Sequence, residues 1–216
     1  MFFQYGKIET DYLKSRDETL GNAIDKIGHI KRPIDTDLFL SIVHHIVGQQ
    51  ISSVAQKTVW KRMNDELGTI TVDVICDLSV DKIQRFGMTF RKAEYIKDFS
   101  HKIKHGELNI DEIKNKSDNE VINELSKLKG IGRWTVEMVL IFCLQRPNIL
   151  SYKDIAIQRG LRMLYHHRDI NKKTFEKYRR RYSPYCTVAS LYLWSVSAGT
   201  IEGMKDYTPK KKAGIK

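Results

Sequence analysis

The sequence predicts an all-α fold. Apolar residues recur at three- and four-residue spacing along almost all of the 216 residues, which is the period of an amphipathic helix. Runs in which apolar and polar residues alternate, as they would in strands, are almost absent. No solenoid-type repeat is present, so we expect a bundle-like globule.

A tight link joins the first two predicted helices of the central part of the chain. The run Leu38–Val47 is apolar on nearly all sides, as in a buried helix, and stops at Gly48. Ser53 and Gln56 have the spacing of a capping box and are expected to open the next helix. Residues 48–52 would then form the link.

Caps and stops predict the later helices in the same way. A second capping box, Ser117 to Glu120, opens a helix that ends at Gly130. Four further helices are predicted at Val136–Leu144, Ile155–Leu164, Asn171–Tyr182 and Ser183–Gly199. The charged, glycine-containing segment 208–216 is expected to be a basic disordered tail.

The charge of the chain indicates a polyanionic partner. Lysine and arginine number 37 against 26 aspartates and glutamates, a formal net charge of +11. DNA, RNA and an anionic membrane are the candidates. No apolar run approaches the ~20 residues that span a bilayer, and the first residues lack the apolar core of a signal peptide. We therefore expect a cytoplasmic protein that binds nucleic acid and has no membrane partner.

The three cysteines favour neither a disulfide framework nor a metal cluster. Cys76, Cys143 and Cys186 are odd in number and widely spaced. A four-thiolate zinc or iron–sulfur site needs one more thiol and closer pairs. We expect no iron–sulfur cluster and interpret each cysteine as a small core residue.

Two glycines predict a tight turn that approaches another molecule. In LKGIGRWT, residues 128–135, Gly130 and Gly132 can adopt positive φ without penalty. The helix that follows offers unpaired N–H groups and the positive end of its dipole to an anion such as a DNA phosphate. Such binding is independent of base sequence. An ordinary helix–turn–helix corner is the alternative.

Four ordered motifs extend this pattern over most of the chain. They are LKGIGRWTVEMVL followed by SYKDIAIQRGL, IVGQQISSVAQKT, FGMTFRKAEYI and SPYCTVASLYLW, and they cover about Leu38 to Trp194. Together they resemble the helix-hairpin-helix (HhH-GPD) DNA glycosylase superfamily, most closely its 3-methyladenine DNA glycosylase II type. Members of this type that carry an additional β-rich domain are longer than this chain.

The resemblance implies a fold, a partner and an activity. It implies two helical lobes, about 34–133 and about 1–33 plus 134–207, with the active site in the cleft between them. The expected partner is double-stranded DNA containing damaged bases, bound by a monomer. The expected activity is base excision repair, in which a base is flipped out of the duplex and its glycosidic bond is hydrolysed.

Asp154 is the expected catalytic residue, because it lies where the family has its catalytic aspartate. Loss of a base leaves positive charge on the deoxyribose, which a fixed carboxylate can stabilise, or the carboxylate can orient the attacking water. The same logic governs glycoside hydrolysis. An N-cap of the helix Ile155–Leu164 is the bland alternative, and one aspartate can fill both roles.

Trp134 predicts the type of reaction. In relatives that cleave the DNA strand after base removal, a lysine at this position attacks the sugar through a Schiff base. Tryptophan cannot do so. The resemblance therefore implies a monofunctional glycosylase without AP lyase activity.

Aromatic side chains predict a pocket for alkylated bases. A cationic base such as 3-methyladenine is recognised through π faces. The predicted pocket residues are Trp134, Trp194, Tyr192 and Met138. Met138 replaces an aromatic residue of the best-known relatives, and core packing is the alternative for each aromatic.

The resemblance also implies residues that bind the DNA backbone, a residue that fills the gap left by the flipped base, and a site for a cation. Gln50 aligns with the wedge residue that fills the place of the flipped base. The predicted DNA-binding residues are Gly130, Ile131, Gly132, Arg133, Thr135, Gln49, Gln50, Lys153 and Arg159. The resemblance also implies a structural Na⁺ or K⁺ on the backbone carbonyls of Ser126, Leu128 and Ile131, and no required cofactor.

Three alternatives stay open at this level. A sister glycosylase would share the fold and Asp154 but act on another damaged or deaminated base. A non-catalytic helix-hairpin-helix module would explain the charge and the hairpin but not Asp154 at its spacing. A basic all-α RNA-binding or structural protein would show salt-dependent binding without preference for damaged duplex.

Overall fold

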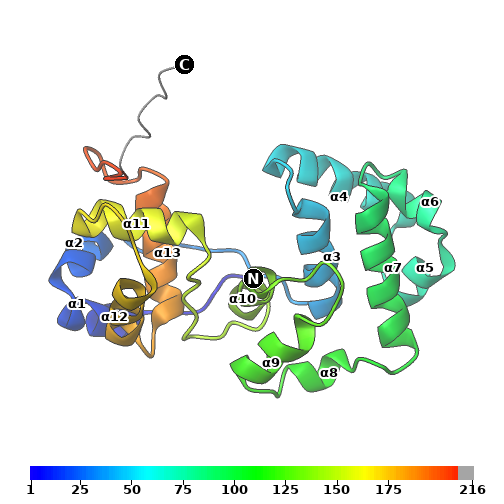
Figure 1. Ribbon diagram of the computed structural model, residues 1–216, viewed down its shortest axis with the longest axis horizontal. Coiled ribbons are helices and arrows are strands. Elements are labelled where there is room, and N and C mark those ends of the chain that lie inside the picture. The colour runs from blue at the N-terminus through cyan, green and yellow to red at the C-terminus, as the bar shows by residue number, and fades with distance from the viewer. Residues whose placement is uncertain (209–216) are drawn as a thin grey trace. The chain divides into compact units, whose positions relative to one another are not determined.

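A computed structural model describes residues 1–208, and this part of the chain is helical (Figure 1). Thirteen α-helices form its regular structure, and its one β contact is an isolated bridge between Phe2 and Pro33. The predicted all-α class is confirmed. The expected tail lies, apart from Thr208, outside the described residues. Within residues 1–208, none of the helices has the length and apolar character needed to cross a membrane.

The chain divides into two units, each described here by itself. The first comprises Met1 and Ile34–Leu144, and the second comprises Phe2–Pro33 and the chain from Gln145 onward. The helices of the first unit are α3 (Leu38–Gly48), α4 (Ser53–Leu67), α5 (Val72–Asp77), α6 (Val80–Gln84), α7 (Phe90–Lys104), α8 (Ile110–Ile113), α9 (Asp118–Leu125) and α10 (Arg133–Phe142). Those of the second are α1 (Lys7–Arg16), α2 (Glu18–Ile27), α11 (Ile155–Tyr165), α12 (Lys172–Tyr182) and α13 (Cys186–Ser197).

The boundary between the units lies later than the sequence suggested. We expected the chain to pass to the other lobe after residue 133, but α10 remains with the first unit. The physical reason is packing: α10 is buried along seven consecutive residues, Thr135–Ile141, and contacts α3 and α9. A helix with that much apolar surface belongs to the unit whose core buries it, here the first unit.

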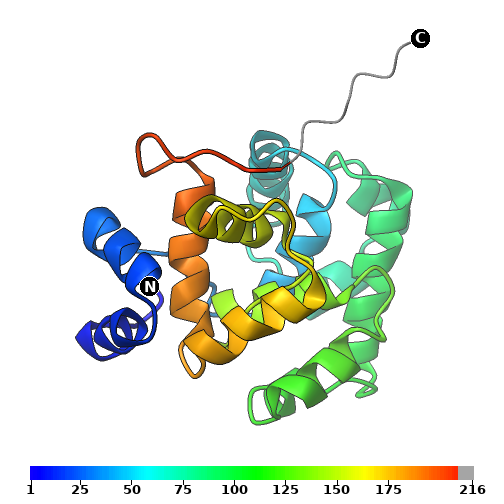
Figure 2. The ribbon, with the colours of Figure 1, turned by 60° about the vertical axis from the view of Figure 1, so that its left-hand side comes forward.

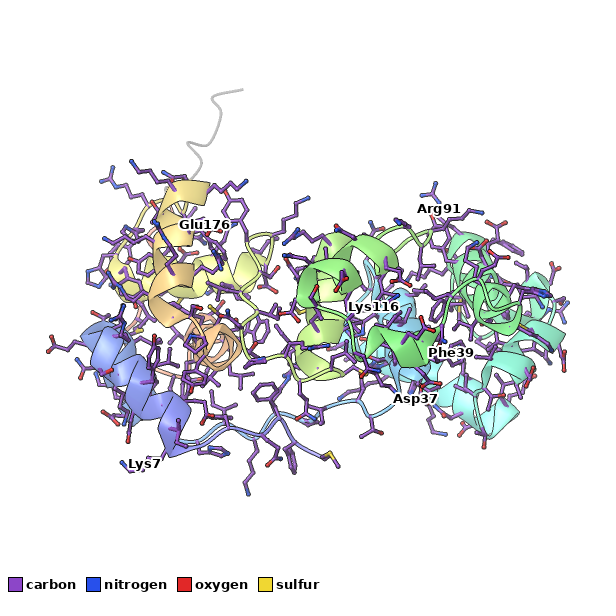
Figure 3. The ribbon with its side chains drawn as sticks, turned by 90° about the horizontal axis from the view of Figure 1, so that it is seen from below. Lys7, Asp37, Phe39, Arg91, Lys116 and Glu176 are labelled. Atoms are coloured by element: carbon purple, nitrogen blue, oxygen red, sulfur yellow. The ribbon has the colours of Figure 1, made fainter. Side chains whose placement is uncertain are left out.

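Helix α3 is the centre of the first unit. Asp37 accepts the Leu40 N–H at 2.8 Å and so caps the helix, which contacts α4, α7 and α10. Phe39 lies next to this cap (Figure 3). Its ring stacks on Phe99 of α7 with centroids 5.5 Å apart. The apolar run predicted to form a buried helix is therefore confirmed.

The start of α4 differs by one residue from the predicted one. The cap of α4 is Ser52, whose Oγ accepts the Ala55 N–H at 3.2 Å, and not Ser53 as expected. The predicted capping partner, Gln56, instead donates to the carbonyl of His44 at 2.9 Å, so its side chain joins α4 to α3. The capping box of Ser117 and Glu120 and the cap at Asn171 are confirmed.

Helix α13 is the centre of the second unit and contacts its other four helices (Figure 2). Ten of its twelve residues are buried. Its closest neighbour is α11, where Gly160 faces the backbone of Leu193. A Cβ added at Gly160 would lie 2.4 Å from the Leu193 carbonyl oxygen, so the two helices approach to a distance that only glycine allows.

We predict that Gly160→Ala destabilises the protein. The added methyl group meets main-chain atoms that no side-chain rotation can move, so α11 and α13 must separate. Overpacking of this kind costs about 1–3 kcal/mol. In thermal unfolding the melting temperature should fall by several degrees. As a control, Gly132→Ala adds a methyl group where no atom lies within 4 Å and should cost much less. Equal melting temperatures for Gly160→Ala and wild type would contradict the packing argument.

Candidate active site

Asp154 lies at the N-terminus of α11 and is 7% exposed. Its Oδ1 accepts the Ile157 N–H at 2.9 Å, which makes it the N-cap of the helix, as the sequence predicted. The positive end of the helix dipole stabilises the negative carboxylate at this position. The result is a carboxylate whose direction is set by the backbone.

The side chain of Trp194 also holds this carboxylate. Its indole Nε1 donates to Asp154 Oδ1 at 3.2 Å, from α13 to the first turn of α11. An N–H donor of an indole ring has no other hydrogen-bonding capacity, so it orients the carboxylate without competing for a proton. The structure therefore brings together two of the predicted site residues, Asp154 and Trp194, in one unit.

The loop that carries Asp154 is itself fixed. Ser151 is buried, and its carbonyl accepts the Asp154 N–H at 3.3 Å. Gln158 Nε2 donates to the carbonyl of Tyr152 at 2.5 Å, and the Tyr152 ring packs edge-on against Phe175 of α12 at 5.1 Å. These contacts leave the carboxylate little freedom to change direction.

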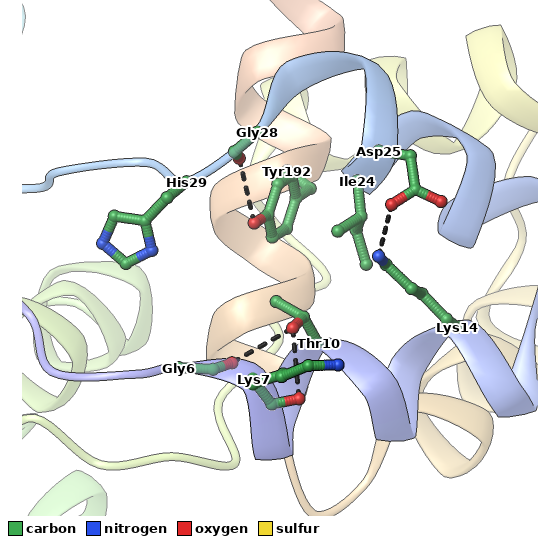
Figure 4. Close-up of a pocket in the computed structure, with 9 residues that line it drawn as sticks. All are labelled: Gly6, Lys7, Thr10, Lys14, Ile24, Asp25, Gly28, His29 and Tyr192. Carbon is green, nitrogen blue, oxygen red and sulfur yellow. Dashed lines mark hydrogen bonds and ion pairs between the residues drawn. The ribbon is translucent and has the colours of Figure 1, made fainter.

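Tyr192 takes a different place from the one predicted. It is 1% exposed and lines a cavity of about 280 Å³ with residues of α1, α2 and their flanking loops, among them Lys7, Asp25 and His29 (Figure 4). Its hydroxyl donates to the carbonyl of Gly28 at 3.1 Å and contacts the Tyr5 hydroxyl at 3.2 Å. Burial raises the pKa of this hydroxyl. Two residues apart on α13, Tyr192 and Trp194 face different sides, so Tyr192 is a core residue.

The two predicted pocket residues of α10 differ in exposure. Trp134, in the first turn, is 41% exposed and presents a large aromatic surface. Met138, one turn later, is 4% exposed and lies within the core of the first unit. At this exposure Met138 packs as a core residue of the first unit, and its place in a base pocket stays a prediction.

The glycine hairpin before α10 has a positive φ at Gly130, as the sequence allowed, but an extended conformation at Gly132. Gly130 has φ +78°, and a Cβ there would lie 2.1 Å from the Tyr95 ring. The Ile131 N–H donates to the Leu128 carbonyl at 3.1 Å and closes the turn. Gly132 is the N-cap of α10, and no side chain caps this helix. Its first N–H groups and its dipole are thus suited to an anion.

Only part of the hairpin can reach a ligand with side chains. Ile131 and Thr135 are 5% and 4% exposed, so that only their backbone groups are candidates for DNA contact. Arg133 is exposed, and its Nε donates to Glu137 at 2.9 Å. This ion pair limits the directions in which the guanidinium can point.

The link between α3 and α4 is tied to the hairpin. Gln49 Nε2 donates to the carbonyl of Gly130 at 2.7 Å. The next residue, Gln50, is exposed and has φ +55°, a left-handed conformation that costs a non-glycine residue roughly 1–2 kcal/mol. The two predicted DNA-binding segments of the first unit, residues 48–52 and 128–135, therefore form one continuous surface element.

The two basic residues predicted beside Asp154 have different surroundings. Lys153 is exposed in the loop. Arg159 Nε lies 3.9 Å from a carboxylate oxygen of Asp206, which also receives two hydrogen bonds of 2.7 Å from Arg162. The Arg162 guanidinium holds the pKa of Asp206 well below its usual range. Sequence reasoning missed Asp206, because a lone aspartate near the C-terminus has no local pattern.

Residues 1–208 contain no group of three histidine, cysteine, aspartate or glutamate side chains that could hold a metal ion. The three cysteines are free thiols. The predicted Na⁺ or K⁺ site would use backbone carbonyls instead, which are of the kind that hard cations bind. The Leu128 carbonyl accepts the Ile131 N–H and keeps a second lone pair, so the donor set fits such an ion in kind.

Comparisons with known proteins identify the family. The pattern of the HhH-GPD superfamily of base excision DNA repair proteins matches residues 43–184. DNA-3-methyladenine glycosylase 1 of Schizosaccharomyces pombe is 30% identical over 179 residues, which are 79% of this chain and 76% of that protein. A Bacillus subtilis relative is 29% identical over 170 residues, and the match spans 59% of its length.

Solved structures agree with this assignment. A DNA-3-methyladenine glycosidase from Bacillus halodurans superposes with a TM-score of 0.82 at 30% identity, covering 93% of this chain and 94% of that one. The S. pombe 3-methyladenine DNA glycosylase in complex with abasic DNA gives a TM-score of 0.80 at 26% identity, covering 94% and 100%. The chain belongs to the HhH-GPD superfamily of base excision DNA repair proteins.

We predict that Gly130→Ala weakens binding to undamaged duplex DNA. The substitution adds a methyl group to a residue with φ +78° and drives it into the Tyr95 ring, so the hairpin must open. We expect roughly tenfold lower affinity, with a salt dependence reduced by the loss of one or two phosphate contacts. Gly68→Ala is the control, because Gly68 has φ +66°, a clear space around it, and a place at the far end of α4. Its DNA affinity should stay near that of wild type, and equal losses for both variants would contradict the role of the hairpin.

Proposed function

We propose that this protein is a monofunctional DNA glycosylase that flips alkylated bases out of duplex DNA and hydrolyses their glycosidic bonds. The observation that carries the proposal is the buried carboxylate of Asp154, fixed by the Ile157 N–H and the Trp194 indole. Family membership supports an excision enzyme. The names of the S. pombe and B. halodurans relatives support 3-methyladenine-type bases as substrates.

Asp154 would act on the charge that develops during bond cleavage. When the base departs, the deoxyribose becomes cationic, and a negative group already oriented toward it lowers the energy of the transition state. The carboxylate needs no rearrangement during the reaction, because α11 and Trp194 fix it beforehand. The same carboxylate can accept a proton from the attacking water, which makes the reaction a hydrolysis.

The hydrolytic outcome rests on Trp134. A bifunctional relative needs an amine at this position to form a Schiff base, and an indole provides none. Trp134 instead offers 41% of its surface at the start of α10, where an aromatic face can stack on a flipped, positively charged base. Within the second unit, Trp194 would offer its indole beside Asp154.

DNA binding would use the hairpin and the 48–52 link. Backbone N–H groups at the start of α10 suit a phosphate, and Gln50 stands exposed where a wedge can fill the gap in the base stack. Lys153 and Arg159 would add phosphate contacts near Asp154. We expect the protein to work as a monomer in the cytoplasm, with a Na⁺ or K⁺ at the hairpin carbonyls and no required cofactor.

The decisive variant is Asp154→Asn. Asparagine is as good an N-cap as aspartate, so α11 should remain folded while the negative charge is lost. On DNA treated with a methylating agent, we expect base release to fall by a factor of hundreds or more, with duplex affinity unchanged within about threefold. Product analysis of the released bases gives the substrate range in the same experiment. Uracil- and 8-oxoguanine-containing duplexes serve as comparison substrates, and near-normal turnover by the variant would refute the assignment of Asp154.

Borohydride trapping tests the monofunctional mechanism separately. Incubation of the wild-type protein with damaged duplex and borohydride should yield no covalent protein–DNA adduct, because Trp134 has no amine to form one. The abasic product should keep an intact strand until it is treated with alkali. A trapped adduct, or strand cleavage that keeps pace with base release, would show that another residue supplies lyase chemistry.

A further inference from the structure

Lys92 is a buried cation whose place in the site is not explained by the proposed chemistry. It lies in the first turn of α7 and is 9% exposed, whereas its neighbour Arg91 is exposed on the same helix (Figure 3). Its ammonium Nζ donates to the carbonyl of Val47 at 2.8 Å and to the carbonyl of Gln49 at 2.6 Å. Burial lowers the pKa of Lys92.

These two carbonyls lie where α3 ends. The last carbonyls of a helix have no partner within the helix and carry the negative end of its dipole. An ammonium group supplied by another helix satisfies them and complements the dipole. Lys92 therefore acts as a C-terminal cap of α3, delivered from α7 across the core of the first unit.

Gln50 lies in the link, residues 48–52, that follows this cap. Gln50 has φ +55°, and such a conformation persists only when surrounding contacts determine it. The contacts are on both sides: Lys92 holds the Gln49 carbonyl, and the Gln49 side chain holds the Gly130 carbonyl at 2.7 Å. The Gln49 residue is thereby fixed at its main chain and at its side chain, directly before the exposed Gln50.

We propose that Lys92 is a positioning residue that holds the backbone of residues 47–49 so that Gln50 is presented to the base stack in a preformed wedge conformation. The inference rests on the proposed function, because it assumes that Gln50 fills the gap left by a flipped base. A wedge that is ordered before binding need not lose conformational freedom on insertion. Loss of Lys92 would then slow base flipping more than it weakens binding to the DNA backbone.

Lys97 provides a matched control within the same helix. Its Nζ donates to the carbonyls of Ile75, Cys76 and Leu78, at and after the end of α5. Like Lys92, Lys97 donates hydrogen bonds to backbone carbonyls near the end of a helix, but the loop that it holds is the one after α5. A methionine at either position keeps a long apolar side chain and removes the ammonium group.

The first experiment measures amide hydrogen exchange in the free protein. In Lys92→Met, the amides of residues 48–52 should exchange at least about tenfold faster than in wild type, while the rest of α3 keeps its protection. In Lys97→Met, the increase should appear around residues 76–79 and not at 48–52. Unchanged exchange at 48–52 in folded Lys92→Met overturns the proposal. If Lys92→Met does not fold, Lys92→Gln, which keeps an uncharged donor but shortens the reach, takes its place.

The second experiment measures flipping and excision. With a fluorescent adenine analogue beside the lesion, Lys92→Met should give at least about tenfold slower flipping and single-turnover excision, with affinity for undamaged duplex within threefold of wild type. Lys92→Arg, which keeps the donors and the charge, should recover most of the rate. Lys97→Met should behave as wild type. A loss of affinity as large as the loss of rate, or no rescue by arginine, would mean that Lys92 is merely structural.

A double-mutant cycle links Lys92 to Gln50. If Lys92 acts through the wedge, Lys92→Met should cause little further loss of flipping in a Gln50→Ala background, whereas independent residues would give multiplied losses. Multiplied losses overturn the proposal. Failure of the proposed function would give a different result, because the wild-type protein would then release no base from methylated DNA. The hydrogen-exchange experiment would still show whether Lys92 holds residues 48–52.

Discussion

The candidate active site depends on one constraint, the fixed direction of a carboxylate at the start of a helix. Asp154 is buried, and a buried negative charge is costly unless it is hydrogen-bonded. The Ile157 N–H and the Trp194 indole satisfy this requirement from two helices. Their separation is set where Gly160 meets the backbone of Leu193. The packing of α11 on α13 and the orientation of the carboxylate are therefore parts of one arrangement.

Features that depend on neighbouring residues could be predicted from the sequence. The caps at Asp154, Asn171 and Ser117 are local, since a side chain binds an N–H two or three residues ahead. The choice between Ser52 and Ser53 could not be predicted, because both are serines at the start of the same helix. It is settled by Gln56, which reaches back to α3 and is not free to complete a capping box.

The site was predicted least well where helix geometry outweighs a family pattern. The prediction for Met138 rests on its position in a motif and that for Tyr192 on its nearness in sequence to Trp194, and both side chains are buried in their own units. Of the other two predicted pocket residues, Trp134 has an exposed aromatic surface and Trp194 contacts Asp154 directly. The role of Lys92 could not be predicted from the motif that contains it, because its partners lie more than 40 residues away in sequence. Contacts of that range leave no periodic signal.

A lysine or arginine that adds to the net charge of the protein need not contact a DNA phosphate itself. Lys92 and Lys97 donate their hydrogen bonds to backbone carbonyls, and Arg162 is paired with Asp206. The carbonyl-bound lysines still contribute to the +11 that attracts a polyanion over long distances. They cannot at the same time hold a phosphate. Short-range contact with a phosphate would then come from other groups, and the N-terminus of α10, which has no side-chain cap, is one candidate. Phosphates are the same at every DNA sequence, so contacts of this kind would hold any duplex and leave the choice of base to the proposed pocket.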